Sequence, residues 1–170
     1  FHVKLSFDDG FAEVIDASTV QRFFVNELGK LDKAVVAGGV YTRTYDALGH
    51  CSSLEDPRGG VTRWERDARG RILAIVDPLG RRTEMRYDDG GRMIELVDQA
   101  GQTTTYVRDT RGNLRTVVLP LGVQSSFEYD ERGRVTAAIA PNGARTEYGY
   151  DAWSNCTEVR LPNGAAYRYS

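Results

Sequence analysis

An aspartate that recurs every 21 residues is the feature that most constrains this fold. A glycine follows three residues after each aspartate, except in the last unit, where Ser154 takes its place. A period of this length indicates a repeat protein, in which one supersecondary unit buries a face only by packing against its neighbours. The aspartates divide residues 45–170 into six units without a gap: Asp46, Asp67, Asp88, Asp109, Asp130 and Asp151.

A second glycine recurs in every unit, usually two residues after a proline. Asp accepts hydrogen bonds from nearby backbone N–H groups, Pro presets φ, and Gly tolerates positive φ, so both positions predict tight turns. The two segments between the turns have the length of strands. The predicted fold is therefore all-β, a ribbon of β-hairpins with a 21-residue period. The second glycine column consists of Gly59, Gly80, Gly101, Gly122, Gly143 and Gly164.

The second segment of each unit alternates, as residues 146–150 illustrate, and this pattern predicts a half-buried strand. The first segment instead places its apolar columns three residues apart, as at Ile72 and Ile75, which predicts a β-bulge or a twist. The inner face of the second segment is expected to carry three columns: a stacking column of Trp64, Met85, Tyr106, Phe127, Tyr148 and Tyr169; a hydroxyl column of Thr62, Thr83, Thr104, Ser125 and Thr146; and a column of Tyr45, Arg66, Tyr87, Arg108, Tyr129 and Tyr150.

The first 44 residues carry the same pattern in degenerate form. Asn26, Gly29 and Gly39 keep the offsets of the aspartate and of the two glycines, with one residue missing before Tyr45. Residues 16–24 resemble the second half of an earlier unit. We therefore expect a degenerate repeat region at 1–44 and six repeats at 45–170, with no linker between them.

Composition excludes two classes of function. The net charge of −2 and the pI near 5.7 provide no basic field for binding nucleic acid. The longest apolar run, residues 34–41, is far too short to span a membrane and is interrupted by Gly38 and Gly39. The chain begins with Phe1 and shows no signal segment, so we expect a piece from the interior of a longer protein.

The cysteines and histidines do not predict a metal or redox site. Cys51 and Cys156 occupy one repeat column, five units apart, where other units carry aliphatic residues or Met, so we expect buried free thiols. His2 and His50 have no partner at metal-ligand spacing. No cofactor or metal is expected.

Two functional alternatives remain open from the residues themselves. The recurring carboxylates could bind calcium, although turn capping explains them better because no second carboxylate recurs in step. The aromatic column could stack on sugars or bases, whereas a packed sheet face is favoured. No catalytic signature is present, so an enzyme is not expected.

The Tyr-Asp runs at residues 45–49, 87–92 and 129–134, with the Asp-Pro-Leu-Gly turn at 77–80, closely resemble the YD repeats of Rhs proteins. The resemblance covers residues 45–170 strongly and the first 44 residues weakly. Arg66 and Arg108 depart from the motif by replacing Tyr, and Ser154 departs by replacing Gly. The pairs Asp56-Pro57 and Asp77-Pro78 resemble the Asp-Pro-x-Gly element near the family's self-cleavage site, which implies a protease role as an alternative, but here they lie in the ordinary repeat turn.

This resemblance implies a β-sheet ribbon that spirals into a hollow shell. In bacterial members the shell encloses a C-terminal toxin domain, and in Gram-negative members delivery runs through a type VI secretion spike; related shells occur in toxin-complex proteins and teneurins. The implied partners are the rest of the shell, the enclosed toxin and a spike protein, for an effector made in the bacterial cytoplasm and secreted or injected into a competing cell. The alternative is a module that binds carbohydrate or a cell surface.

Overall fold

The computed structural model describes residues 2–6, 11–15 and 20–169, with side chains from residue 21 onward. The prediction for residues 16–24 and that for His2 therefore fall wholly or partly outside the described part. The described residues form strands joined by turns, bends and short irregular segments, with one short 3-10 turn, η1 (Pro120–Gly122), so the all-β prediction is confirmed. The chain divides into two compact units, residues 1–84 and 85–170.

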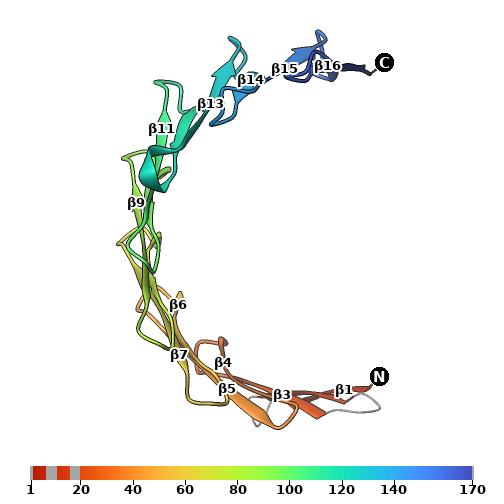
Figure 1. Cartoon of the computed structure of the whole chain (residues 1–170). Helices are drawn as coiled ribbons and strands as arrows, with labels where there is room; N and C mark the ends of the chain where they lie inside the picture. The colour runs from red at the N-terminus through yellow and green to blue at the C-terminus, as the bar shows by residue number, and fades with distance from the viewer. Residues whose placement is uncertain (1, 7–10, 16–19, 170) are drawn as a thin grey trace. The chain divides into compact units, whose positions relative to one another are not determined.

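In both units each strand pairs antiparallel with the next strand along the chain (Figure 1). The first unit holds β1 (His2–Ser6), β2 (Phe11–Ile15), β3 (Val20–Val25), β4 (Leu31–Val36), β5 (Gly39–Tyr45), β6 (Cys51–Glu55), β7 (Val61–Arg66), β8 (Ile72–Val76) and the start of β9 (Arg82–Tyr87). The second holds β10 (Met93–Val97), β11 (Thr103–Arg108), β12 (Leu114–Val118), β13 (Gln124–Tyr129), β14 (Val135–Ile139), β15 (Arg145–Tyr150), β16 (Cys156–Arg160) and β17 (Ala166–Arg168).

A β-bulge interrupts the ladder beside the Asp turn in most repeats, on the strand that follows the turn. In the hairpin of β7 and β8, Glu65 lies opposite Ala74 but Arg66 lies opposite Ile72, so one residue is extra on β8. The same shift recurs between β11 and β12, β13 and β14, and β15 and β16. It explains the apolar spacing of three residues, because the bulge returns Ile72 and Ile75 to one face.

The pairing defines two faces. Phe127 on β13 lies opposite Ala138 on β14, which lies opposite Thr146 on β15; we call this the aromatic face. Glu128 lies opposite Ala137 on the other side of the ribbon, which we call the charged face. The predicted alternation of apolar and polar faces therefore holds through the hairpins.

Burial is shallower than the sequence predicts. Among the described residues only Ala34, Ala74 and Ala137 are buried. The rings of the aromatic face are partly exposed, and so are the two thiols, Cys51 and Cys156, for which full burial was expected. The reason is geometric, because the hairpins follow one another in a single layer within each unit and share an edge rather than a second packed sheet.

The degenerate repeat requires one correction. The offset predicted Gly39 as the equivalent of the second glycine, but the residue with positive φ is Gly38, at +78°. Ala37 and Gly38 form a two-residue turn between β4 and β5, with Val36 opposite Gly39. The missing residue therefore lies within this turn, and it shifts the glycine column by one position.

Candidate functional site

The Asp turn is built around one carboxylate oxygen. Oδ1 of Asp130 accepts hydrogen bonds from the backbone N–H groups of Arg132 and Arg134, at 2.9 and 3.0 Å. The backbone of Gly133 donates to the carbonyl of Asp130 at 3.0 Å and closes the turn. All six predicted aspartates accept, through Oδ1, a hydrogen bond from the backbone N–H of the residue four positions later. They are Asp46, Asp67, Asp88, Asp109, Asp130 and Asp151.

These hydrogen bonds favour the charged carboxylate. The backbone N–H of Arg134 lowers the pKa of Asp130 below its usual value, partial desolvation opposes the shift, and the Arg134 guanidinium, 2.7 Å from Oδ2, adds to it. The pKa of Asp46 is lowered in the same way by the backbone of His50. The imidazole Nδ1 of His50 lies 3.3 Å from Oδ2 of this carboxylate.

The first glycine has a positive φ, and in some units it also leaves no room for a Cβ. Gly112 has a φ of +93°, and a Cβ there would lie 1.9 Å from the Arg92 guanidinium of the preceding turn. A Cβ on Gly70 would lie 2.8 Å from the His50 ring. Ser154 adopts a φ of +74° and keeps the turn, with its N–H bound to the carbonyl of Asp151 at 3.2 Å.

The second glycine is required only by its backbone conformation, because a Cβ there would meet no neighbouring atom. Gly143, for example, has a φ of +79°, its N–H binds the carbonyl of Ala140 at 2.9 Å, and no atom lies within 4 Å of where a Cβ would be. The structure places positive φ at all six predicted positions: Gly59, Gly80, Gly101, Gly122, Gly143 and Gly164.

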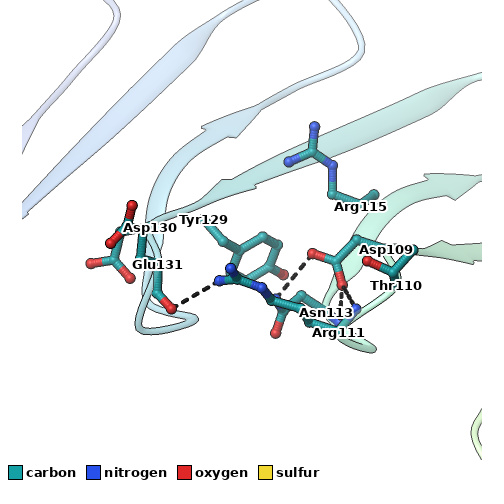
Figure 2. A pocket seen from close by; sticks show the side chains of 8 residues that line it. All are labelled: Asp109, Thr110, Arg111, Asn113, Arg115, Tyr129, Asp130 and Glu131. Carbon is teal, nitrogen blue, oxygen red and sulfur yellow. Dashed lines mark hydrogen bonds between the residues drawn. The ribbon is translucent and has the colours of Figure 1, made fainter.

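In the second unit, side chains also link the Asp109 turn to the Asp130 turn and the Asp130 turn to the Asp151 turn. Arg111 donates to the carbonyl of Glu131 at 2.9 Å, and Arg134 donates to the carbonyl of Asp151 at 3.0 Å. Figure 2 shows the first of these bonds crossing a depression of about 300 Å³ between two successive turns, where Tyr129 lies between them. In this depression the carboxylates of Asp109 and Asp130 bind turn backbone N–H groups, and the Arg111 guanidinium binds a backbone carbonyl, so these three groups are already engaged.

The column of Tyr and Arg ties neighbouring hairpins together. The hydroxyl of Tyr129 donates to the carbonyl of Leu114 at 2.8 Å. Arg66, which replaces Tyr, reaches the equivalent carbonyl of Cys51 at 3.4 Å. The sequence does not reveal this equivalence, because a phenol and a guanidinium share only the ability to donate a hydrogen bond at the end of a long side chain.

The predicted stacking column lies on the aromatic face, but its rings pair with aliphatic side chains. Trp64 faces Ile75, and Tyr148 faces Val159 on the adjacent strand. One intervening strand separates successive members. Of the column Trp64, Met85, Tyr106, Phe127, Tyr148 and Tyr169, all are partly exposed except Tyr169, which is exposed.

The charged face carries a network that sequence reasoning missed. Arg145 on β15 binds Glu128 on β13 and Glu147 on its own strand. Arg160 lies 3.8 Å from Glu147 and 3.4 Å from Glu158. The chain of alternating charges thus crosses β13, β15 and β16 and leaves no unpaired charge cluster at its centre.

No metal centre is formed by the side chains from residue 21 onward, which contain no cluster of three potential His, Cys, Asp or Glu ligands. The thiols of Cys51 and Cys156 donate to backbone carbonyls two residues away, in separate units. No helix in the described part is long and apolar enough to cross a membrane.

These features define a repeat protein whose recurring polar groups serve its own turns and ladders. The chain belongs to the RHS repeat family, whose model, described as "RHS Repeat", matches residues 45–82, 66–103, 87–124, 108–145 and 129–166. The matches step by one 21-residue unit and begin at Tyr45. The assignment of residues 1–44 as a degenerate repeat region stays a prediction.

Solved toxin structures share the fold. The Tc holotoxin pore of Photorhabdus luminescens matches with a TM-score of 0.68 and 14% identity, over 88% of this chain and 10% of that one. The TcdB2-TccC3-TEV crystal structure matches with a TM-score of 0.70 and 14% identity, over 93% and 11%. TcdB2-TccC3-Cdc42 gives 0.55 and 18%, over 94% and 11%. This chain thus spans about a tenth of their length, and no curated protein matches it.

Proposed function

We propose that this chain is a non-catalytic wall segment of an Rhs-type shell that encloses a C-terminal toxin domain and takes part in its delivery. Membership in the RHS repeat family and the fold shared with Tc toxin structures support this assignment. Its partners are then the remaining repeats of the shell and the enclosed domain.

One observation carries the proposal: the recurring chemistry is consumed by the repeat itself. The carboxylates of Asp109 and Asp130 bind their own turn backbones, and the Arg111 guanidinium between them binds the backbone carbonyl of Glu131. Catalysis requires an irregular, convergent set of groups, whereas these groups recur once per unit in the same role. A shell wall needs no such site, because it encloses a domain by covering it with a continuous surface.

The delivery route we propose is a type VI secretion spike, with synthesis in the bacterial cytoplasm and release into a competing cell. It follows from the resemblance of the Tyr-Asp motifs to Rhs effectors. The Tc structures support the broader statement that such repeats accompany toxin components.

The test uses the full-length polypeptide that carries this chain. One whole unit, residues 87–107, is deleted, and protease protection of the C-terminal domain is measured by mass spectrometry. We expect the parent to protect that domain and the deletion to expose it, because one repeat of wall is lost, while the catalytic activity of the domain itself remains.

A domain that is digested equally fast in the parent would refute enclosure. Glycan-array binding that disappears in the Trp64→Ala variant would instead support the carbohydrate-binding alternative. Secretion in a strain without the spike protein would refute the proposed delivery route without affecting enclosure.

A further inference from the structure

Two turns of the second unit contain the same tetrapeptide, Pro-Asn-Gly-Ala, at residues 141–144 and 162–165. They hold the two Asn-Gly pairs of the sequence, and both asparagines, Asn142 and Asn163, are exposed. The first turn connects β14 to β15, and the second connects β16 to β17. Because the local sequence is identical, a difference in reactivity between the two turns must come from the structure around them.

Both asparagines take over the role of a capping aspartate. Where a turn begins with Asp, as at Asp56, the carboxylate Oδ1 accepts the backbone N–H of the fifth turn residue at 2.9 Å. In turn 140–144 the N–H of the fifth residue, Ala144, instead binds Oδ1 of Asn142 at 3.0 Å. Asn163 accepts the corresponding bond at 3.0 Å. The side-chain acceptor has thus moved to the third turn residue, which directly precedes the glycine.

An asparagine in front of glycine carries a reactive amide. The backbone nitrogen of Gly143, after losing its proton to a solvent base, can attack Cγ of Asn142, because glycine has no side chain to block the approach. The bond from Cγ to Nδ2 breaks, the leaving nitrogen takes up a proton and departs as ammonia, and a succinimide ring remains. Solvent water then opens the ring, at Cγ to give aspartate or at the main-chain carbonyl to give isoaspartate.

The closed turn holds this reaction back. The N–H of Gly143 donates to the carbonyl of Ala140 at 2.9 Å, and the capping bond fixes the side-chain amide of Asn142. Attack requires that both hydrogen bonds break, so the turn must first open. Gly164 and Asn163 make the same two bonds, at 2.9 and 3.0 Å, so the protection within each turn is equal.

The strands that follow the two turns are held differently. β15 pairs with β14 on one side and with β16 on the other, and its first residue, Arg145, donates two hydrogen bonds of 2.7 Å to Glu128. β17 pairs with β16 through three residues, all of which are exposed. Opening of the turn at 161–165 therefore breaks fewer contacts than opening of the turn at 140–144.

We propose that Asn142 and Asn163 are sites of deamidation whose rates are set by the opening of their hairpins, and that Asn163 is the faster site. Each event leaves a new negative charge, and isoaspartate also lengthens the backbone of a tight turn by one methylene group. The change persists after the hairpin closes, so the two residues keep a covalent record of past openings. This inference does not depend on what the wall encloses.

The test is incubation of the 170-residue chain in mildly alkaline buffer, followed by peptide mapping with mass spectrometry that separates aspartate from isoaspartate. Synthetic peptides of residues 138–147 and 159–168 give the intrinsic rates. The Arg145→Ala variant removes the bonds to Glu128 and leaves both Asn-Gly pairs intact. Asn163 in the same variant is the matched control, because loss of the overall fold would accelerate both sites.

In the folded parent we expect Asn142 to deamidate at least about tenfold more slowly than its peptide, and Asn163 to react at least about threefold faster than Asn142. In urea beyond the unfolding transition, both sites should match their peptides. Arg145→Ala should accelerate Asn142 and leave Asn163 unchanged.

Three results would overturn the proposal. The first is a rate at both sites of the folded chain that equals the peptide rate, and the second is an Asn142 that reacts as fast as Asn163. The third is an Asn142 rate that does not respond to Arg145→Ala, because hairpin opening would then not set it.

Discussion

Arg145 binds Glu128 from two strands away. Its guanidinium donates two hydrogen bonds of 2.7 Å to the carboxylate, and it crosses β14 above Ala137, which is fully buried. Arg82 and Glu65 form the same bidentate pair across the buried Ala74. The methyl side chains of Ala137 and Ala74 on the middle strands leave room for the guanidinium to pass.

This geometry predicts the effect of enlarging the middle residue. Ala137→Leu should displace Arg145 from Glu128 and lower the free energy of unfolding by about 1–3 kcal/mol, the usual cost of overpacking. The measurement is urea unfolding followed by circular dichroism. The control is Thr116→Leu, in the same column but with no ion pair crossing it, which should change stability by less than about 0.5 kcal/mol. Equal effects at both positions would contradict the crossing ion pair as the cause.

The turn that uses Ser154 should be improvable. Ser154→Gly relieves a positive φ on a non-glycine residue and should raise the free energy of unfolding by up to about 1 kcal/mol. The reciprocal Gly133→Ser variant should lower it by a similar amount. Thermal and urea unfolding of both variants test whether the two stability changes have opposite signs. A loss of stability in Ser154→Gly would show that the contact of the Ser154 hydroxyl with Arg134 stabilises the turn more than relief of the positive φ does.

Stability should fall in acid. The pKa of Asp130 is lowered in the folded protein, so its contribution is fully present above the unfolded pKa, about 3.9, and is lost as the pH falls through the lower folded value. The other five turn aspartates share this direction. We expect a nearly constant urea midpoint between pH 7 and 5 and a decline below about pH 4.

The Asp130→Asn variant isolates one of these turns. It should have a lower urea midpoint at pH 7, because the ion pair with Arg134 is lost, and a shallower decline in acid, because one titrating group is missing. If the urea midpoint of the parent already drops between pH 7 and 5, titratable groups other than the turn aspartates would be responsible.

The aromatic face should contribute modestly in the isolated chain. Phe127 is partly exposed, so Phe127→Ala should cost about 1–2 kcal/mol, less than the 3–5 kcal/mol typical of a fully buried ring. Urea unfolding at low protein concentration tests this. A cost above about 3 kcal/mol would mean that this face is covered in solution.

Much of this architecture is predictable because the same turn motif occurs many times in the sequence. Asp130 and Gly133 define a turn whose chemistry is local, and six copies fix its position. The three-residue spacing of Ile72 and Ile75 similarly predicted the bulge, since only an extra residue returns both side chains to one face.

Two features escaped sequence reasoning for physical reasons. Gly38 and Gly39 are adjacent, so a turn shortened by one residue leaves the positive-φ position ambiguous. Arg145 and Glu128 are 17 residues apart, a separation that carries no local signal and becomes a contact only once the register of three strands is known. The burial of the aromatic rings and thiols was overestimated, because a 21-residue sequence period does not indicate whether a second layer covers the sheet.

The register of the hairpins also sets a stagger. Phe127 lies opposite Ala138, and Ala138 opposite Thr146, which is 19 residues further along the chain, whereas the equivalent of Phe127 in the next repeat is Tyr148. Each repeat is thus displaced by two residues, about 7 Å, along the strands for every roughly 10 Å across them. The resulting slant of about 35° falls in the range by which strands tilt in closed barrels. The direction in which such a wall grows is therefore encoded in the difference between a chain period of 21 and a ladder step of 19.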